Sequence, residues 1–245
     1  MAEYFITFDT WNQDGQISPS SSINYNEYTL NLGSEDSYVG CVATATSQIL
    51  YYWGVTQLAN NQALTLSSLH FDSSDYYVNT YYDYDMQDYI NIYIDKDAEE
   101  NGFLSFSQLN AKLGNIEYDF DPDEIAALSF AVGVKVESTY EIGQTGAYFE
   151  ETRDFLIECG FVNATVTGYE ADSDGLLVSD KIDLFAELVD DITSGYVVLV
   201  GIDDFDIYGQ VHGRHAVVVD GYDSDNQTFH FNLGWGGYYD GWYSL

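Results

Sequence analysis

The amino-acid sequence predicts an α+β fold, with helices early in the chain and an antiparallel sheet at its end. Two observations lead to this prediction. Apolar residues recur with helical spacing in residues 41–53, 148–159 and 181–193, whereas β-type apolar runs follow one another from Tyr196 onward. Strands that gather after the helices, instead of alternating with them, favour an antiparallel sheet over a parallel one.

The first predicted helix covers residues 41–53 and fades near Gly54. Its apolar stripe consists of Val42, Ala45, Ile49 and either Tyr52 or Trp53. Cys41 lies in the first turn of this helix, where unpaired backbone N–H groups and the positive end of the helix dipole favour a thiolate. The alternative interpretation is a small, buried and inert cysteine.

Further elements follow from similar signals. A helix is expected from Asp121 to Phe130, and residues 132–136 are expected to form a turn into a short strand. The next helix runs from Tyr148 to Cys159, and residues 161–167 alternate like a strand. A third helix is predicted from Lys181 to Thr193. Its expected apolar face consists of Ile182, Phe185, Leu188, Val189 and Ile192.

The C-terminal part of the chain is predicted to be β-structure. Its expected strands are Val197–Ile202, His215–Asp220, Thr228–Asn232 and Trp242–Leu245. Residues 1–40 have a loop-like composition, and residues 55–95 are too rich in Tyr and Asp for elements to be assigned. Since neither a repeat nor a Pro- or Gly-rich linker divides the chain, residues 1–245 are predicted to form one domain.

The charge excludes some classes of function. Of the 245 residues, 41 are Asp or Glu and six are Lys or Arg, which gives a formal net charge of −35. Phosphate contacts need Lys and Arg, so this balance excludes nucleic-acid binding and disfavours anionic membrane surfaces. Two cysteines do not make a disulfide framework, and no apolar run reaches the ~18 residues of a membrane span. The acidic surface is expected to keep the protein soluble, and it could also suit high salt, divalent cations or cationic substrates.

Two segments near the C-terminus carry polar residues that sheet packing does not require. His215 stands at the entrance of an apolar strand, two residues after Gly213, which permits a close backbone approach or an unusual turn. Asn232 ends the next strand, just before a glycine–tryptophan corner. A cysteine nucleophile needs a base, and the imidazole of that base needs a third group that orients it. Cys41, His215 and Asn232 follow one another in the chain order of such a catalytic triad. Gln13 could donate a hydrogen bond to the developing oxyanion, together with the backbone N–H of Cys41.

These motifs resemble the streptopain family of secreted bacterial cysteine proteases. The resemblance rests on Gly40-Cys41-Val42-Ala43-Thr44-Ala45-Thr46-Ser47-Gln48, on Gly213 to Gly221, on Asn232-Leu233-Gly234-Trp235-Gly236-Gly237, on Asp240-Gly241-Trp242-Tyr243 and on Trp11-Asn12-Gln13. A weaker likeness extends through residues 131–134, 143–147 and 183–195, so the resemblance spans most of the chain.

The resemblance implies a papain-like fold, in which the cysteine helix packs against the C-terminal sheet half. It also implies endopeptidase activity on proteins or peptides, without a metal or an organic cofactor. Cys41 matches the nucleophile, His215 the general base, Asn232 the residue that orients the imidazole, and Gln13 the oxyanion donor. Gly40, Gly213, Trp235 and Leu233 are expected to shape the site. Leu233 departs from the family, which has a Trp there that normally covers the Asn–His hydrogen bond from water.

Members of this family are typically secreted as zymogens with an N-terminal prodomain. This sequence shows no signal peptide and no prosegment, so it is expected to be the mature domain of a longer, secreted precursor and to be a monomer. Two alternatives stay open. One is another papain-type thiol amidase, which would not be expected to share the Gly-Trp-Gly-Gly corner. The other is an inactive interaction module on a protease scaffold.

Overall fold

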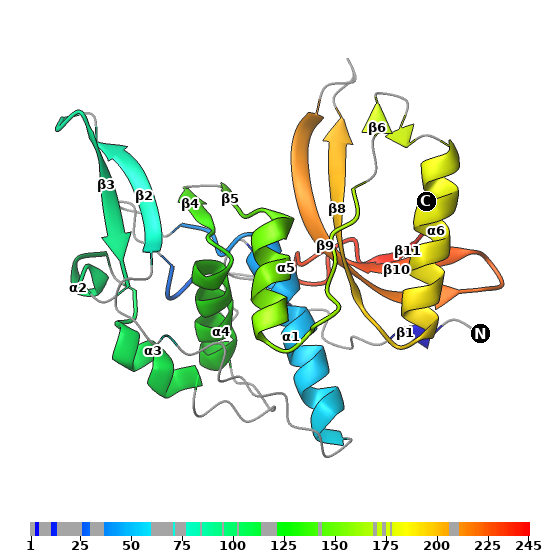
Figure 1. Cartoon of the computed structure of the whole chain (residues 1–245), viewed down its shortest axis with the longest axis horizontal. Coiled ribbons are helices and arrows are strands. Elements are labelled where there is room, and N and C mark those ends of the chain that lie inside the picture. Colours follow the sequence, from blue (N-terminus) through cyan, green and yellow to red (C-terminus); the bar gives the residue numbers. More distant parts are fainter. Residues whose placement is uncertain are drawn as a thin grey trace. The chain divides into compact units, whose positions relative to one another are not determined.

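The structure is a computed structural model that describes the chain in segments. These are residues 3–4, 11–13, 26–29, 37–59, 71, 77–83, 85–94, 96–101, 103–113, 122–141, 144–168, 171–172, 175–176, 178–205 and 211–245. The chain divides into two compact units (Figure 1). One unit consists of residues 12–165, and the other of residues 1–11 and 166–245. The first is mainly helical and the second contains an antiparallel sheet, which confirms the predicted α+β class.

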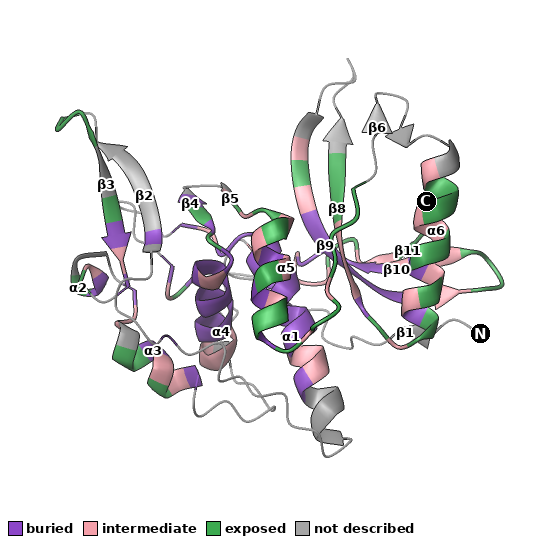
Figure 2. Ribbon diagram, viewed as in Figure 1, coloured by how far each residue is buried: buried purple, intermediate pink, exposed green. Residues whose placement is uncertain are grey.

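The unit of residues 12–165 is built around two buried helices. Helix α1 spans Cys41–Ala59 and contacts α4, which spans Pro122–Lys135. Figure 2 shows α4 and the N-terminal half of α1 mostly in the colour of buried residues. The remaining elements of this unit are α2 (Ala98–Asn101), α3 (Phe106–Leu113), α5 (Phe149–Glu158) and the hairpins β2–β3 (Tyr77–Asp83, Asp88–Tyr93) and β4–β5 (Thr139–Glu141, Gln144–Gly146). Helix α1 begins at Cys41 as predicted, but it continues past Gly54.

Helix α4 corrects the predicted turn and strand at residues 132–136, because the helix continues to Lys135. The run of valines suggested a strand, yet tertiary packing overrides that preference. Gly133 fits inside this helix because the Tyr140 hydroxyl passes close by, and a Cβ at Gly133 would lie 2.1 Å from that oxygen. The helix then closes with hydrogen bonds from Glu137 N–H to the Val134 carbonyl (3.2 Å) and from Ser138 N–H to the Gly133 carbonyl (2.9 Å). This pair of bonds is a Schellman motif.

Helix α5 agrees with its prediction, but the strand expected at residues 161–167 is wrong. Gly160, at φ +101°, ends the helix by a second Schellman motif, in which Phe161 N–H donates to the Leu156 carbonyl at 3.0 Å. Residues 161–168 then form turns and irregular structure. Val162 is 74% exposed, so the alternating pattern in this segment does not mark a buried face.

The other unit contains an antiparallel sheet centred on β9. The described strands are β1 (Glu3–Tyr4), β8 (Val198–Phe205), β9 (Val211–Asp223), β10 (Thr228–Asn232) and β11 (Gly241–Tyr243), with a short β6–β7 hairpin (Ala171–Asp172, Gly175–Leu176) beside them. Strand β9 pairs with β8 along most of its length, and its second half also pairs with β10. The four predicted C-terminal strands are therefore confirmed, whereas β1 lies in a part that the sequence analysis expects to be loop.

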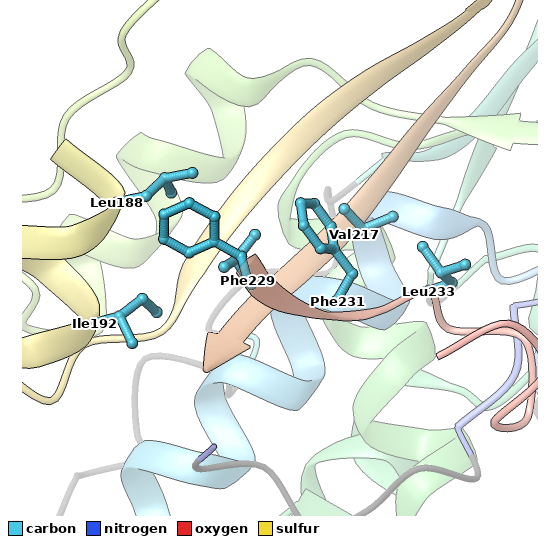
Figure 3. Close-up of a cluster of buried hydrophobic side chains, with 7 residues drawn as sticks. Leu188, Ile192, Val217, Phe229, Phe231 and Leu233 are labelled. Atoms are coloured by element: carbon cyan, nitrogen blue, oxygen red, sulfur yellow. The ribbon is translucent and has the colours of Figure 1, made fainter. Parts of the chain in front are cut away.

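Helix α6 (Val178–Thr193) covers one face of this sheet. It contributes Leu188 and Ile192 to an apolar cluster (Figure 3). The sheet contributes Val217, Val219, Phe229 and Phe231, and Leu233 follows β10 into the same cluster. Ile182 is 63% exposed, so the buried face of α6 is shorter than predicted. Among the described helices, none combines the length and apolar character that crossing a membrane would need.

An ion pair between His230 and Asp220 joins β10 to β9. His230 Nδ1 lies 2.6 Å from Oδ1 of Asp220, whose side chain has an exposed fraction of 0%. Burial acts to lower the pKa of His230, but the hydrogen bond and charge of Asp220 and the charge of Asp240 outweigh it and raise the pKa. The folded state therefore holds this proton more tightly than the unfolded chain. His230 contributes stability that is complete below the unfolded pKa of about 6.5 and is lost as the pH rises through the higher folded pKa.

Replacing His230 with Gln removes this titration. The free energy of unfolding of the wild type should exceed that of His230→Gln by more at pH 6 than at pH 9, as measured by urea denaturation at both values. Asp225→Asn, which removes an exposed carboxylate from the β9–β10 turn, is the control and should not change this pH dependence. A difference that stays constant or grows with pH would show that His230 is not protonated in the folded state.

Candidate active site

Cys41 is the first residue of α1. The carbonyl of Gly40 accepts hydrogen bonds from the Thr44 backbone N–H (3.1 Å) and the Thr44 hydroxyl (2.9 Å), so Gly40 caps the helix. Cys41 is half-buried, whereas the next nine residues of the helix are buried. The N–H groups of a first helical turn have no intrahelical partner, and the helix dipole is positive there. A helix N-terminus is one of the environments that favour the thiolate form of a cysteine.

The backbone before Cys41 is tightly held. Gly40 has φ +88°, and a Cβ there would lie 2.6 Å from the carbonyl oxygen of Thr145 on β5. Its N–H donates to the main-chain carbonyl of Gln13 at 3.2 Å. Gln13 is half-buried, and its Oε1 has no hydrogen-bond partner among the described residues. Gly40 therefore fixes the entry to the cysteine helix between β5 and the Gln13 segment.

His215 lies on β9 in the other unit, and the loop after β10 passes beside it. Strand β10 ends at Asn232, which pairs with Val218. Val218 lies three residues after His215 on β9. Leu233, the residue after Asn232, is therefore close enough to contact the imidazole. Nε2 of His215 lies 2.7 Å from the Leu233 carbonyl oxygen. A carbonyl can only accept, so Nε2 carries the proton and Nδ1 of the neutral ring has the lone pair that a base needs.

Two further features set the properties of this imidazole. Trp235 stacks on it, with ring centroids 4.6 Å apart and an interplanar angle of 16°. Burial lowers the pKa of His215, and the hydrogen bond to the Leu233 carbonyl opposes that effect in part. His215 is therefore neutral near pH 7, in the tautomer that can accept a proton at Nδ1.

Asn232 and Asp240 hold the same loop. Oδ1 of Asn232 accepts from Gly234 N–H at 3.1 Å, and Oδ1 of Asp240 accepts from Leu233 N–H at 2.7 Å. Asn232 is 3% exposed. The sequence analysis predicts Asn232 as the orienting residue, but it misses the Leu233 carbonyl, because a main-chain group leaves no signature in side-chain identity. It also misses Asp240, although the Asp-Gly-Trp-Tyr motif contains it.

Each of the two units thus contains part of the predicted active-site residues. The unit of residues 12–165 brings Gln13 and Gly40 together beside Cys41, and the sheet unit brings together His215, Leu233, Trp235 and the turn of Asn232. Gly213 differs from expectation. It pairs with Asp204 inside β9, and a Cβ there would meet no described atom within 4 Å, so neither a close approach nor an unusual turn requires glycine.

Cys159, the second thiol, is buried at the end of α5 and forms no disulfide with Cys41. Burial raises the pKa of Cys159 to about 12, and the charge of Glu158 adds to this effect. It is therefore a neutral thiol near pH 7. Among the described residues, no group of three or more His, Cys, Asp or Glu side chains could hold a metal ion.

Comparison with known proteins identifies a family and a fold. The model of the Peptidase C10 family matches residues 20–243, which is the family that the sequence motifs resemble. Among solved structures, the active wild-type interpain A cysteine protease of Prevotella intermedia has a TM-score of 0.58 and 22% identity, over 100% of this chain and 86% of that chain. A mutant prointerpain A fragment from the same organism has a TM-score of 0.54 and 19% identity, over 98% of this chain and 65% of that one. A search among curated proteins gives no match.

The close contact between Gly40 and Thr145 should make a substitution of Gly40 destabilising. Gly40→Ala should lower the free energy of unfolding by about 1–3 kcal/mol from the left-handed backbone alone, and the collision with Thr145 should add to this loss. Denaturant titration measures the change. Gly146→Ala is the matched control, because a Cβ there meets no described atom within 4 Å, and its effect should stay within about 0.5 kcal/mol. Equal effects of both changes would show that Gly40 is not sterically required.

Proposed function

The chain belongs to the Peptidase C10 family and is a cysteine peptidase, and from this premise we propose that it is an endopeptidase whose nucleophile is Cys41. The observation that carries the proposal is the state of His215. Its Nε2 proton is held by the Leu233 carbonyl, and the ring is neutral near pH 7. Nδ1 is therefore the basic atom, as the activation of a thiol requires.

The proposed reaction runs through a thioester. His215 Nδ1 takes the proton of the Cys41 thiol, and the thiolate attacks the carbonyl carbon of the substrate peptide bond. The C–N bond then breaks, and the imidazolium returns the proton to the leaving amine. A water molecule attacks the resulting acyl-cysteine, with His215 again accepting a proton, and releases the acid product and the thiol. Every step uses side chains and water, so the proposed mechanism needs no cofactor.

We propose that Gln13 and the Cys41 backbone N–H stabilise the oxyanion. Both groups belong to the same unit, and the main chain of Gln13 is bonded to Gly40, the residue before the nucleophile. Donors held in place before the reaction cost no reorganisation when charge develops on the substrate oxygen. The contact to Gly40 uses only main-chain atoms, so a change of the Gln13 side chain leaves it intact.

Protein or peptide substrates and action outside the cell are proposed from the family resemblance. The net charge of −35 argues against nucleic acid and anionic membranes as partners. The competing proposal, an inactive interaction module, would be favoured by Leu233 in place of the family's Trp. Trp235 already covers one face of the imidazole, which supports the active enzyme instead.

The proposed nucleophile and base are tested by substitution. Cys41→Ser and His215→Ala should abolish hydrolysis of a fluorogenic peptide, and Cys41→Ser should also prevent titration by a thiol-specific epoxide. Cys159→Ser is the control and should retain activity, because that thiol is buried with its pKa raised to about 12. Loss of activity in Cys159→Ser with the fold intact, or full activity in Cys41→Ser, would mean that Cys41 is not the nucleophile.

The oxyanion role of Gln13 has its own test. Gln13→Ala and the isosteric Gln13→Glu both remove the amide donor, and each should lower kcat by about 10²–10³-fold with little change in KM. Steady-state kinetics on the same peptide measures both constants. A loss below twofold in both variants would reduce Gln13 to a residue that only supports the Gly40 backbone.

A further inference from the structure

We propose that the turn of residues 26–29 holds the backbone that leads into Cys41, and that Asn26 and Thr29 are positioning residues for this nucleophile. The inference rests on the proposed function, since it concerns the placement of the Cys41 thiol. All the residues involved belong to the unit of residues 12–165. None of the motifs that identify the catalytic residues contains this turn.

The segment that needs support is the one that enters α1. Residues 37–40 are in neither a helix nor a strand, and Ser37, Val39 and Gly40 are buried. A buried N–H or carbonyl group without a partner is costly, so the main chain of such a segment depends on hydrogen bonds from outside it. The course of this segment determines where α1 begins, and Cys41 is the first residue of that helix.

Asn26 supplies the partner of one buried N–H group. Its Oδ1 accepts from the Val39 backbone N–H at 2.9 Å, and Asn26 is 6% exposed. Loss of this acceptor would leave the N–H of Val39, a residue that is 1% exposed, without a partner. The next N–H group, that of Gly40, donates to the Gln13 carbonyl at 3.2 Å. Two successive N–H groups before Cys41 are therefore held by two different segments.

Thr29 holds the same segment through its hydroxyl. Its backbone N–H donates to the Asn26 carbonyl at 3.2 Å and closes the turn. The hydroxyl lies near the carbonyl oxygens of Asn26 and Ser37, and the Ser37 oxygen is the nearer one. A hydroxyl has one proton to donate, and the Asn26 carbonyl already accepts from the N–H, so the proton goes to the Ser37 carbonyl. The turn thus binds the segment at a carbonyl and at an N–H group.

Tyr28 anchors the turn to two helices. Its hydroxyl donates to Oδ1 of Asp123 in the first turn of α4, and Lys112 in the last turn of α3 pairs with Oδ2 of the same carboxylate. Nζ of Lys112 lies 5.2 Å from the centroid of the Tyr28 ring. Burial and the bond to Asp123 raise the pKa of Tyr28 to about 12, so the phenol remains a donor near neutral pH. Since α4 also packs against α1, the turn and the cysteine helix have the same support.

Asn26 and Thr29 act on catalysis through the main chain of residues 37–40. Without their hydrogen bonds the entry to α1 shifts, and the thiol and backbone N–H of Cys41 shift with it. A misplacement of about 1 Å can cost about 10²-fold in rate. The thiol and the proposed oxyanion donor act on the transition state, so the loss is expected in kcat, with little change in KM.

The experiment uses Thr29 because this position offers a matched pair of variants. Thr29→Val is nearly isosteric and removes the hydroxyl, whereas Thr29→Ser keeps it. Thr29→Val should lower kcat on a fluorogenic peptide by about 10–100-fold with little change in KM, and Asn26→Ala should act in the same way. Thr29→Ser should keep most of the wild-type kcat. Glu27→Gln, at the exposed residue of the same turn, is the control and should alter neither constant.

Active-site titration separates a positioning role from a loss of folded protein. A thiol-specific epoxide counts the molecules whose Cys41 can react, and kcat is then expressed per titrated site. Thr29→Val should titrate to the same endpoint as the wild type and still turn over more slowly per site. A role in stability alone would instead reduce the number of titrated sites and leave kcat per site unchanged.

A second measurement does not need activity. Amide hydrogen exchange of Val39 reports whether its N–H keeps its acceptor. The amide of Leu128, a buried residue of α4, is the internal reference. Relative to this reference, the Val39 amide should exchange at least about tenfold faster in Asn26→Ala than in the wild type. A general loss of stability would accelerate both amides alike.

The outcomes separate this inference from the proposed function. If Thr29→Ser is as impaired as Thr29→Val, the hydroxyl is not the group that matters. If Thr29→Val keeps the wild-type kcat per site, or if Asn26→Ala leaves Val39 exchange unchanged relative to Leu128, the turn does not position Cys41. If the wild type neither hydrolyses peptides nor reacts at Cys41, the proposed function fails, whereas the exchange comparison still decides whether the turn holds this backbone.

Discussion

The hydrogen bond from His215 to the Leu233 carbonyl is the constraint on which the chemistry of this chain depends. At 2.7 Å it decides which nitrogen carries the proton and which one can act as a base. Several other elements of the sheet unit position the two partners of this bond. β10 ends at Asn232, the loop turns back beside β9, and α6 packs over the cluster that holds Leu233. Displacing any of these elements would move the acceptor.

Much of the framework could be predicted from the sequence, because its signals are local. The start of α1 at Cys41 follows from helical periodicity after a glycine, and the bounds of β10 follow from alternation that ends at Asn232. Residues 132–136 could not be assigned correctly, because their run of valines favours a strand. The packing of Tyr140 from β4 against Gly133 is visible only in three dimensions. The strand predicted at residues 161–167 was wrong because the alternating pattern there does not mark a buried face, as the 74% exposure of Val162 shows.

For the site, residue types were predictable and their contacts were not. Cys41, His215, Asn232 and Gln13 are chemically distinctive, so order along the chain suffices to nominate them. Whether Asn232 meets an imidazole or a backbone N–H depends on a turn of a few residues, and its bond to Gly234 N–H is visible only in three dimensions. Gly213 is the opposite case. The sequence analysis gave it a site-shaping role because it lies near His215, but its surroundings do not require glycine.

A main-chain acceptor also changes what evolution can alter at this position. Every amino acid brings the same carbonyl, so residue 233 could exchange a large aromatic ring for leucine while the imidazole kept its partner. The selective demand then falls on the neighbours that shape the bend, above all a left-handed residue at 234 and an acceptor at 240. The side chain of residue 233 can therefore vary, whereas Gly234 and Asp240 are expected to be conserved.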